Sequence, residues 1–556
     1  MEDLRLFIVG AAGEGIQTIG EIVARAFLAH GYPVFASQEF ESRIRGGHSS
    51  VRLRVADAPR NAPTETADVL LAVNSGALEH YRSALRDGGL AIGPEASSEG
   101  AGAIGVPFSD LAIAHGGAPI YANAVAAGAL CAAVGLPLAV LERVLEETFA
   151  SKGEEVVRPN LASAKAGFEV ASSRLGGARA VEIPARSERY AFASAHETIP
   201  IAAAAAGCRF IAAYPMSPST GIITAFAREK ELGVFAEQAE DEIAAINMGL
   251  GASAAGARAM TATSGGGFGL MVEGISLAGM IETPIVIILA QRPGPATGLP
   301  TRTAQEDLLF ALHAGHGEFP KVLLAPSDPQ CAIATTIRAF DLADRYQIPA
   351  IVLTDQFLAD SRFSLERLAL SDTLPRANLA DPDAIEAYAR YRLTGDGVSP
   401  RLYFGQGERL VVLDSDEHTQ NGHITEDLAD VRPAMVEKRL EKVRRLAREM
   451  AGPISSEVED AELVLIGWGS TKGSIDEAVA HLRADGRRVG ALHFTELWPL
   501  PELAFPEDVR YWTVEGNATG QFARLLEAET GLRIEGRIGR YDGLPIDAET
   551  ILEELR

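Results

Sequence analysis

Short apolar runs alternate with helical stretches along most of the 556 residues. The first example is an apolar run at residues 5–10, a glycine turn of sequence GAAGEGIQ, a helical stretch at 16–29 and a second apolar run at 32–37. A strand that passes through a tight turn into a helix and then into another strand is typical of the doubly wound α/β class. The alternation therefore predicts a multidomain α/β protein.

Breaks in this alternation divide the chain. Apolar periodicity is lost between residues 172 and 191, where Gly, Pro and charged residues gather, and again over the polar segment 366–430. Such composition is typical of linkers and irregular segments. We expect a Rossmann-like domain at residues 1–182, a second α/β domain with an irregular extension at 190–430, and a third α/β domain at 455–556.

A connector helix is expected at residues 431–454. Leu440, Val443, Leu446 and Met450 share one face of this segment, and basic residues occupy the remaining faces. The pattern predicts a solvated amphipathic helix between the second and third domains.

Net charge and cysteine usage exclude several classes of protein. Fifty basic against 75 acidic residues give a net charge of −25, so neither a nucleic acid nor an anionic membrane surface is an expected partner. The three cysteines include no CxxC pair that could hold zinc or an iron–sulfur cluster, so no metal site is expected in this chain.

The N-terminal residues MEDLRLFIVG lack the basic region of a signal peptide, which predicts a cytoplasmic location. Residues 121–141 carry no charge, but they are rich in alanine and contain Pro137. We therefore expect a buried helix there, and no membrane span.

The glycine turn of the first domain has the order GxxGxG, formed by Gly10, Gly13 and Gly15, whereas dinucleotide sites usually have GxGxxG. Glu39 follows the second predicted strand, where a ribose-binding acid lies in such sites. A nucleotide-dependent redox protein therefore remains an alternative.

Three strand ends of the second domain carry specialised loops, namely AAYPMSPSTGI (212–222), TSGGGFG (263–269) and QRPGPATGLPT (291–301). Prolines fix such loops, hydroxyl groups supply donors or cap a helix, and glycines allow the backbone to approach a ligand closely. Ligands of open α/β sheets bind outside the carboxyl ends of the strands. A ligand site at this edge of the second domain is therefore expected.

Three consecutive acids, Glu240, Asp241 and Glu242, precede a stretch rich in small residues that we interpret as a helix. At about 100° per residue, Glu240 and Glu242 point about 200° apart on a helix, so only one of them faces a ligand. Small residues such as Ala244 and Gly251 share the face of Glu240 and would leave room for a ring. The helix dipole favours acids at this end, which accounts for Asp241.

Several segments together resemble the alpha subunits of 2-oxoacid:ferredoxin oxidoreductases, namely YPMSPST, QAEDEIAAINMGLGASAAGARAMTATSGGGFGLM, QRPGPATGLPTRTAQEDL, GHGEFPKVLLAP, SDEH, GWGSTKG and VEGNATGQ. The first 180 residues, with GAAGEGIQ and ESRIRGGHS, resemble the gamma subunit of that family. The resemblance covers nearly the whole chain. It implies a gamma domain fused to a pyrimidine-type thiamine diphosphate domain, followed by a transketolase-like α/β domain.

The implied activity is the oxidative decarboxylation of a 2-oxoacid, with CoA as co-substrate and ferredoxin as electron acceptor. A separate beta subunit would supply the diphosphate and Mg²⁺ site and a [4Fe-4S] cluster, in a dimer of alpha–beta heterodimers. The fused gamma–alpha order favours 2-oxoglutarate as the substrate. Pyruvate, a branched-chain 2-oxoacid, or a non-catalytic role in assembly remain alternatives.

The resemblance also assigns the cofactor-binding residues. The family's activating glutamate stands two residues after a glutamine, which matches Gln238 and Glu240. Enzymes of this kind place a carboxylic acid against the pyrimidine nitrogen of the cofactor. Tyr214 and Pro215 of YPMSP are expected at the cofactor as well.

Substrate contacts are expected from Arg292, Thr301 and Ser217, where the planar guanidinium of the arginine suits a carboxylate. Ser217 stands where the family usually has threonine in YPITP, which leaves the selectivity among 2-oxoacids open. Arg43 and Arg45 are candidates for contact with CoA or a partner subunit.

Two further features are expected to be structural. The GDG sequence at 395–397, with Asn421, has nearly the spacing of a diphosphate motif but lacks the flanking strand and helix, so we expect a loop. His316 and His418 belong to the resemblance and are interpreted as structural or interface residues.

Overall fold

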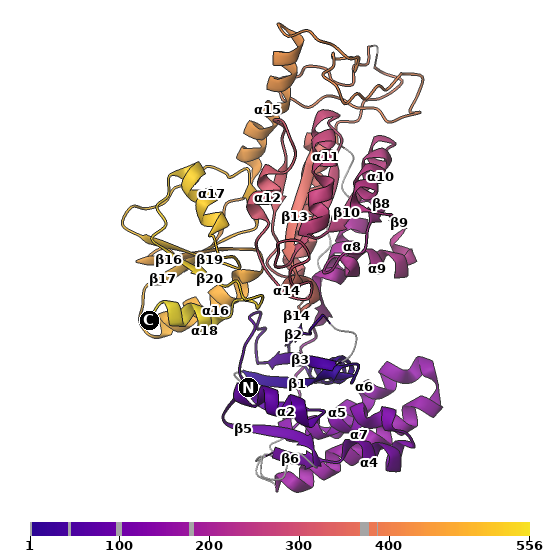
Figure 1. Cartoon of the computed structure of the whole chain (residues 1–556), viewed down its shortest axis with the longest axis vertical. Coiled ribbons are helices and arrows are strands. Elements are labelled where there is room, and N and C mark those ends of the chain that lie inside the picture. The colour runs from indigo at the N-terminus through magenta and orange to yellow at the C-terminus, as the bar shows by residue number, and fades with distance from the viewer. Residues whose placement is uncertain (1–2, 43–45, 96–102, 177–182, 367–376, 386) are drawn as a thin grey trace. The chain divides into compact units, whose positions relative to one another are not determined.

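The computed structural model of the chain describes residues 3–42, 46–95, 103–176, 183–366, 377–385 and 387–556 (Figure 1). The chain forms two compact units. Unit 1 comprises Met1–Ala193 and Ser361–Leu368, and unit 2 comprises Ser194–Asp360 and Ala369–Arg556. Each unit contains helices packed on sheets, so the expected multidomain α/β class is confirmed.

The sheet of unit 1 has eight strands in the order β6-β5-β4-β1-β3-β2-β14-β7. Its strands are β1 (Leu4–Ala12), β2 (Val34–Glu39), β3 (Gly46–Val55), β4 (Ala67–Ala72), β5 (Leu85–Pro94), β6 (Ala103–Val106), β7 (Ala191–Ala193) and β14 (Arg362–Leu365). The sequence indicates a doubly wound opening, but β3 lies antiparallel between β1 and β2. The sheet is therefore mixed, and β1 and β2 are not neighbours.

Strand β14 completes this sheet from far along the chain. It pairs antiparallel with β2 on one side and with β7 on the other. The Ser364 hydroxyl accepts from the backbone N–H of Val34 at 2.6 Å and donates to its carbonyl oxygen at 2.8 Å. Arg362 forms an ion pair with Glu21 at 2.8 Å. Without β14, the backbone of β2 would have an open edge.

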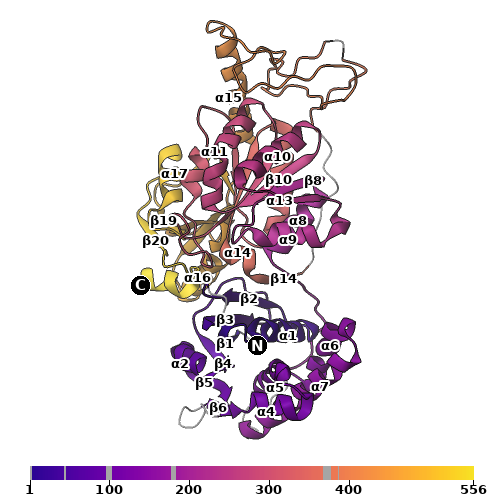
Figure 2. The same cartoon turned by 45° about the vertical axis from the view of Figure 1, so that its right-hand side comes forward.

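The helices of unit 1 are α1 (Ile16–Ala29), α2 (Ser75–Tyr81), α4 (Phe108–Leu111), α5 (Ala122–Val134), α6 (Leu138–Phe149) and α7 (Glu154–Leu175). Helix α1 lies beside β1 and β3, and α5 runs next to α7 (Figure 2). A Cβ on Gly128 would lie 2.0 Å from the carbonyl oxygen of Ala164, and one on Gly167 would lie 2.1 Å from that of Val125. The two helices therefore approach backbone to backbone, and α5 is buried, as expected.

Unit 2 contains two sheets. The seven-stranded sheet has the order β18-β12-β13-β11-β10-β8-β9, and the five-stranded sheet has the order β15-β17-β16-β19-β20. The strands are β8 (Cys208–Ala213), β9 (Phe235–Gln238), β10 (Arg258–Thr263), β11 (Ile285–Gln291), β12 (Val322–Leu324), β13 (Pro349–Asp355), β15 (Ile454–Ser456), β16 (Leu463–Trp468), β17 (Val489–Phe494), β18 (Glu496–Trp498), β19 (Arg510–Glu515) and β20 (Gly536–Gly539).

The helices of unit 2 are α8 (Ala195–Ala205), α9 (Thr220–Arg228), α10 (Glu242–Ala254), α11 (Gly265–Met280), α12 (Leu308–His313), α13 (Pro329–Tyr346), α14 (Gln356–Asp360), α15 (Val431–Glu449), α16 (Lys472–Ala484), α17 (Gln521–Thr530) and α18 (Ala548–Glu554). One hydrophobic cluster joins Leu289 and Leu353 of the larger sheet to Trp468 and Phe522 of the C-terminal part. This shared core explains why both sheets belong to one unit.

Helix α15 is not the solvated connector that its sequence indicates. Its buried residues include Lys438, Arg439 and Lys442. The ammonium groups of Lys438 and Lys442 lie 2.6 and 2.5 Å from the carboxylate of Glu282, and all three side chains are almost fully buried. These three basic residues, which we expected in solvent, therefore pack against the rest of unit 2, whereas Arg444, Arg445 and Arg448 are exposed.

Among the described residues, no single helix is long and apolar enough to span a membrane. A pair bent by 116°, at 108–116 and 119–134, meets the criteria of length and composition only when its two parts are taken together.

Candidate active site

The carboxyl ends of parallel strands β8, β9, β10 and β11 lie at one edge of the seven-stranded sheet. The segments that follow these strands carry the predicted site residues. They also expose large apolar side chains, namely Tyr214 (40%), Ile243 (48%), Leu270 (48%) and Leu299 (48%). A sheet edge with acids, an arginine and exposed apolar groups is a typical setting for a ligand.

The three consecutive acids, Glu240, Asp241 and Glu242, lie in three different environments. Strand β9 ends at Gln238, and α10 begins only at Glu242, so Glu240 precedes the helix. Asp241 is the N-cap, and its carboxylate accepts from the backbone N–H of Ala244 at 2.7 Å. The interpretation of Asp241 as a helix-end residue is thus confirmed. Glu240 is not helical, so our expectation that it shares a helix face with Ala244 and Gly251 is wrong.

Glu240 is exposed, whereas Glu242 is only 2% exposed. We expected Glu242 to point away from the ligand side as an outward-facing neighbour of Glu240, and its burial shows that this expectation is wrong. A Cβ on Gly267 would lie 2.3 Å from Glu242 Oε1 and 2.2 Å from Thr263 Oγ1, so the carboxyl packs against the first turn of α11. Burial raises the pKa of Glu242, and the neighbouring Asp241 adds to this effect.

Arg292 and Ser217 are brought together at this edge. Arg292 Nη1 donates to the backbone carbonyl oxygen of Ser217 at 2.7 Å, which joins the loop after β11 to the loop after β8. Partial burial lowers the pKa of the Arg292 guanidinium, while Asp307 opposes that shift. The Ser217 side chain is exposed, and its hydroxyl remains available to a ligand.

The other predicted residues lie on the same segments. Tyr214 is exposed and Pro215 is half-buried, both directly after β8, and Thr301 is half-buried at the far end of the loop that begins with Arg292. Within the described parts of the chain, the side chains of Thr301 and Glu240 make no hydrogen bond with Arg292 or Ser217.

Sequence reasoning missed Asp307, which lies at this edge. A Cβ on Gly265 would lie 2.7 Å from Asp307 Oδ2, and the backbone N–H of Asp307 donates to Gln291 Oε1 at 3.0 Å. The buried Oδ2 atom has no hydrogen-bond partner among the described residues. Burial and the nearby Glu306 raise the pKa of Asp307 to about 6. The acid pair of AQEDLL ahead of an apolar run was the signal available in the sequence.

Replacing Asp307 by asparagine is expected to stabilise the protein at pH 8 by about 2 kcal/mol, with no gain near pH 4. The reason is that the folded pKa of Asp307 exceeds its unfolded value, so its contribution to stability is present below pH 4 and is lost as the pH rises through about 6. Urea unfolding of the Asp307→Asn variant and wild type at pH 4.5 and 8 measures the difference. An equal change at both pH values would contradict the burial of this carboxyl.

The GDG sequence forms a turn, as expected. Gly397 has a φ of 73°, and the Asp396 carboxylate accepts from the backbone N–H of Val398 at 3.1 Å. This hydrogen bond and the Thr394 hydroxyl lower the pKa of Asp396 against the opposing effect of burial. In the described part of the chain, no three His, Cys, Asp or Glu side chains gather as metal ligands.

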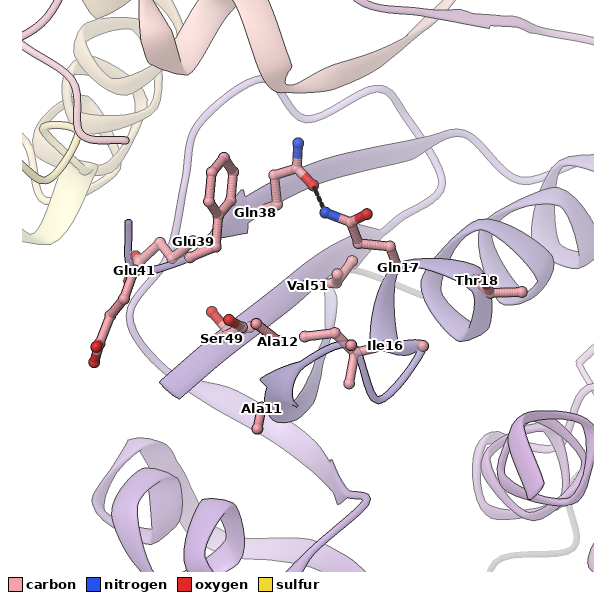
Figure 3. Close-up of a pocket in the computed structure, with 14 residues that line it drawn as sticks. Ala11, Ala12, Ile16, Gln17, Thr18, Gln38, Glu39, Glu41, Ser49 and Val51 are labelled. Atoms are coloured by element: carbon pink, nitrogen blue, oxygen red, sulfur yellow. Dashed lines mark hydrogen bonds between the residues drawn. The ribbon is translucent and has the colours of Figure 1, made fainter. Parts of the chain in front are cut away.

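Unit 1 has a pocket of about 320 Å³ beside its glycine turn, lined in part by Gly13, Gly15, Gln38 and Glu41 (Figure 3). Figure 3 shows Gln17 and Gln38 facing one another, with a hydrogen bond of 3.1 Å.

Glu14 of the glycine turn and Glu39 at the end of β2 are both already bonded within the chain. Glu14 accepts from the backbone N–H of Ala11 at 2.7 Å, which uses a donor that a phosphate would need. Glu39 forms an ion pair with Arg52 at 2.7 Å. Arg43 and Arg45, the candidates for CoA or partner contacts, lie outside the described residues.

Known protein families cover most of the chain. Residues 201–438 match the family described as pyruvate flavodoxin/ferredoxin oxidoreductase, thiamine diP-binding, and residues 5–170 match pyruvate ferredoxin/flavodoxin oxidoreductase. A 2-oxoacid:ferredoxin oxidoreductase alpha subunit of Aeropyrum pernix is 31% identical over 98% of this chain and 96% of its own length. This chain belongs to the same family. It is thus a subunit of a thiamine diphosphate-dependent 2-oxoacid:ferredoxin oxidoreductase.

Two other relatives refine the comparison of this alpha subunit. The 2-oxoglutarate synthase subunit KorA of Methanothermobacter thermautotrophicus is 36% identical over 53% of this chain and 78% of its own. The structure of 2-oxoglutarate:ferredoxin oxidoreductase from Magnetococcus marinus, with 2-oxoglutarate, coenzyme A and succinyl-CoA bound, has a TM-score of 0.92 and is 31% identical. It covers 100% of this chain and 99% of its own. The N-terminal gamma-like domain and the thiamine diphosphate-binding domain of the family are therefore both present.

Proposed function

We propose that this alpha subunit oxidises 2-oxoglutarate with CoA, giving succinyl-CoA, CO₂, one proton and two electrons that pass to ferredoxin. The full-length similarity to an enzyme whose structure holds 2-oxoglutarate, coenzyme A and succinyl-CoA carries this choice of substrate. Pyruvate and branched-chain 2-oxoacids are the alternatives, because Ser217 replaces the usual threonine of YPITP.

The residues of the sheet edge fit a thiamine ring. Glu240 presents an exposed carboxyl after β9. At the start of α11, a Cβ on Gly266 would meet nothing closer than 3.9 Å, so this turn is open to a ligand. Tyr214 and Pro215 would border the ring. When bound, thiamine diphosphate supplies an electron sink for cleavage of the bond to the leaving carboxylate. Glu240 would hold a proton at its carboxyl towards the pyrimidine nitrogen, which requires a site closed from water.

The partner that would close the site is a beta subunit. Glu240 and Tyr214 are exposed in this chain, although an activating carboxyl needs an apolar environment to favour its hydrogen bond. We infer that the beta subunit covers this edge and provides the Mg²⁺, diphosphate and [4Fe-4S] sites, in a dimer of heterodimers.

Arg292 and Thr301 would bind the substrate at opposite ends of one loop. The guanidinium of Arg292 is held by the Ser217 carbonyl and has further donors for the carboxylate of the 2-oxoacid. Ser217 and Thr301 would supply hydroxyl groups, and Arg43 and Arg45 would contact CoA or the beta subunit.

Co-expression with a beta subunit that carries a GDG diphosphate motif and cluster cysteines tests the proposal. CoA-dependent reduction of a viologen dye is expected with 2-oxoglutarate, at a kcat/KM above those with pyruvate and 2-oxoisovalerate. A preference for pyruvate would contradict 2-oxoglutarate as the substrate but not the proposed type of reaction. Assembly without turnover of any 2-oxoacid would favour a non-catalytic subunit.

A further inference from the structure

The loop that carries Arg292 and Thr301 has little support of its own. Residues 294–299 are consecutively exposed. Within the loop, the backbone N–H of Leu299 donates to the Pro293 carbonyl at 3.0 Å. The Gly294 N–H donates to Glu306 Oε2, beyond the loop, at 3.0 Å. Exposed loops with few contacts sample many conformations, so a fixed Arg292–Thr301 geometry needs an external anchor.

Thr303 supplies a first anchor just after the loop, because its backbone N–H donates to the Gly543 carbonyl at 3.1 Å and its hydroxyl accepts from the Phe357 N–H at 3.2 Å.

Gln305, two residues further on, supplies a second anchor with more hydrogen bonds. Its backbone N–H donates to the Gly516 carbonyl at 2.7 Å, and its Oε1 accepts from the Gly516 N–H at 2.8 Å. Its Nε2 donates to the Trp468 carbonyl at 2.8 Å, and its own carbonyl accepts from Asn517 Nδ2 at 3.0 Å. Every polar group of this buried residue is thus bonded to the carboxyl ends of β16 and β19.

The segment that binds Gln305 is itself held by hydrogen bonds. Buried Glu515 accepts from the backbone N–H groups of Phe522 and Ala523 and from Asn517 Nδ2, at 2.7, 3.1 and 3.0 Å. Asn517 Oδ1 accepts from the N–H of Gly520 at 2.8 Å, which fixes the start of α17. The motifs GWGSTKG and VEGNATGQ, which the proposed chemistry does not use, thereby form a fixed support.

Gln521 adds a second connection to the same segment. Its Nε2 donates to the Glu306 carbonyl at 2.6 Å, and its Oε1 accepts from the N–H of Leu309 at 2.9 Å. Helices α12 and α17 consequently lie side by side (Figure 1). Gly469, with a φ of 59°, allows the close approach, because a Cβ there would lie 3.0 Å from Gln305 Nε2.

We propose that Gln305 is a positioning residue. It holds the C-terminal end of the 292–301 loop and thereby fixes the position of Thr301 relative to Arg292. The proposal rests on the proposed function of those two residues as substrate ligands. The other end of the loop continues from strand β11 at Gln291, so it stays fixed when Gln305 is lost. Glu240 follows a different strand and would keep its place.

The variant Gln305→Met keeps the side-chain length and removes both side-chain hydrogen bonds. In the complex with a beta subunit, KM for 2-oxoglutarate is expected to rise about tenfold, as two lost hydrogen bonds of the usual strength allow, while kcat changes less than about threefold. Gln347→Met is the matched control. Gln347 is equally buried in unit 2, where it donates to the Ser399 carbonyl at 2.6 Å and accepts from Arg390 at 3.0 Å. It should lower the melting temperature similarly and leave KM unchanged.

Hydrogen exchange of the full alpha chain provides a readout that needs no turnover. Amides of residues 294–302 should exchange about tenfold faster in Gln305→Met than in wild type or Gln347→Met. Gln521→Met should shift KM and exchange in the same direction by a smaller factor, and it carries the test if Gln305→Met does not assemble. Unchanged exchange and KM in both variants would overturn the proposal. A wild-type complex without turnover would instead contradict the proposed function, and the exchange experiment would still decide the role of Gln305.

Discussion

Replacing Glu240 by glutamine in the assembled enzyme is expected to lower kcat by about 10²- to 10⁴-fold, the range that a positioned acid or base usually contributes. Glutamine keeps the size of the side chain but cannot transfer a proton from a carboxyl. Because Glu240 is exposed and precedes α10, the melting temperature of the chain should not change. Viologen reduction and thermal unfolding measure the two effects.

The variant Glu242→Gln is the control for this experiment. Glu242 is two residues away, but its carboxyl is buried against Gly267 and faces the start of α11. Glutamine fits the same space, so kcat should stay within about threefold of wild type. A large loss of kcat in Glu242→Gln with normal activity in Glu240→Gln would move the activating role to Glu242.

Replacing Glu282 by glutamine is expected to destabilise the chain by about 3–5 kcal/mol at pH 7, the usual effect of leaving buried charges without a partner. Its carboxylate is the shared acceptor for Lys438 and Lys442, and these ammonium groups hold the pKa of Glu282 well below its usual range, against the opposing effect of burial. Burial lowers the pKa of Lys442 to about 7 even with Glu282 present. Urea unfolding of the full chain measures the loss.

The change of this stability loss with pH can also be predicted. Without Glu282, both lysines have folded pKa values below their unfolded ones, so the unfolded chain binds more protons and stability rises with pH. The defect of Glu282→Gln should therefore be smaller at pH 9 than at pH 7. Glu449→Gln, at the exposed end of α15 where Glu449 contacts Arg345 at 2.7 Å, should cost less than about 1 kcal/mol at either pH. Equal effects of the two variants would contradict the buried cluster.

Much of the fold followed from local patterns. The apolar runs at 5–10 and 32–37 became β1 and β2, and the helical stretch at 16–29 became α1, because strands and helices have different apolar periods. Strand β9 was missed, since its four residues FAEQ at the sheet edge include exposed Phe235 and Gln238. Because β9 ends at Gln238, α10 begins only at Glu242. Glu240 and Glu242 therefore do not lie on one helix, although our comparison of their directions assumed that they do.

The other features that the sequence did not predict depend on contacts between residues far apart in the chain. A lysine on an amphipathic helix normally points to solvent, and only the folded position of Glu282 gives Lys438 and Lys442 a reason to be buried. Asp307 likewise looked like an ordinary acid ahead of α12. Its environment depends on Gly265, which is 42 residues away in sequence but adjacent at the sheet edge. The loops after β8 and β11 were predictable because strand ends at one edge of a sheet meet by topology.

Strand β14 has a consequence for the synthesis of the chain. The Val34 and Ser364 partners that join β2 to β14 are 330 residues apart. At about 5–20 residues per second, a ribosome needs roughly 15 to 65 seconds to make that interval. During this time β8 to β13 are produced, while the edge of β2 opposite β3 has no β14 to pair with. The N-terminal unit is thus the first to begin folding and among the last to finish, and its nascent edge is where a chaperone would have the longest time to bind.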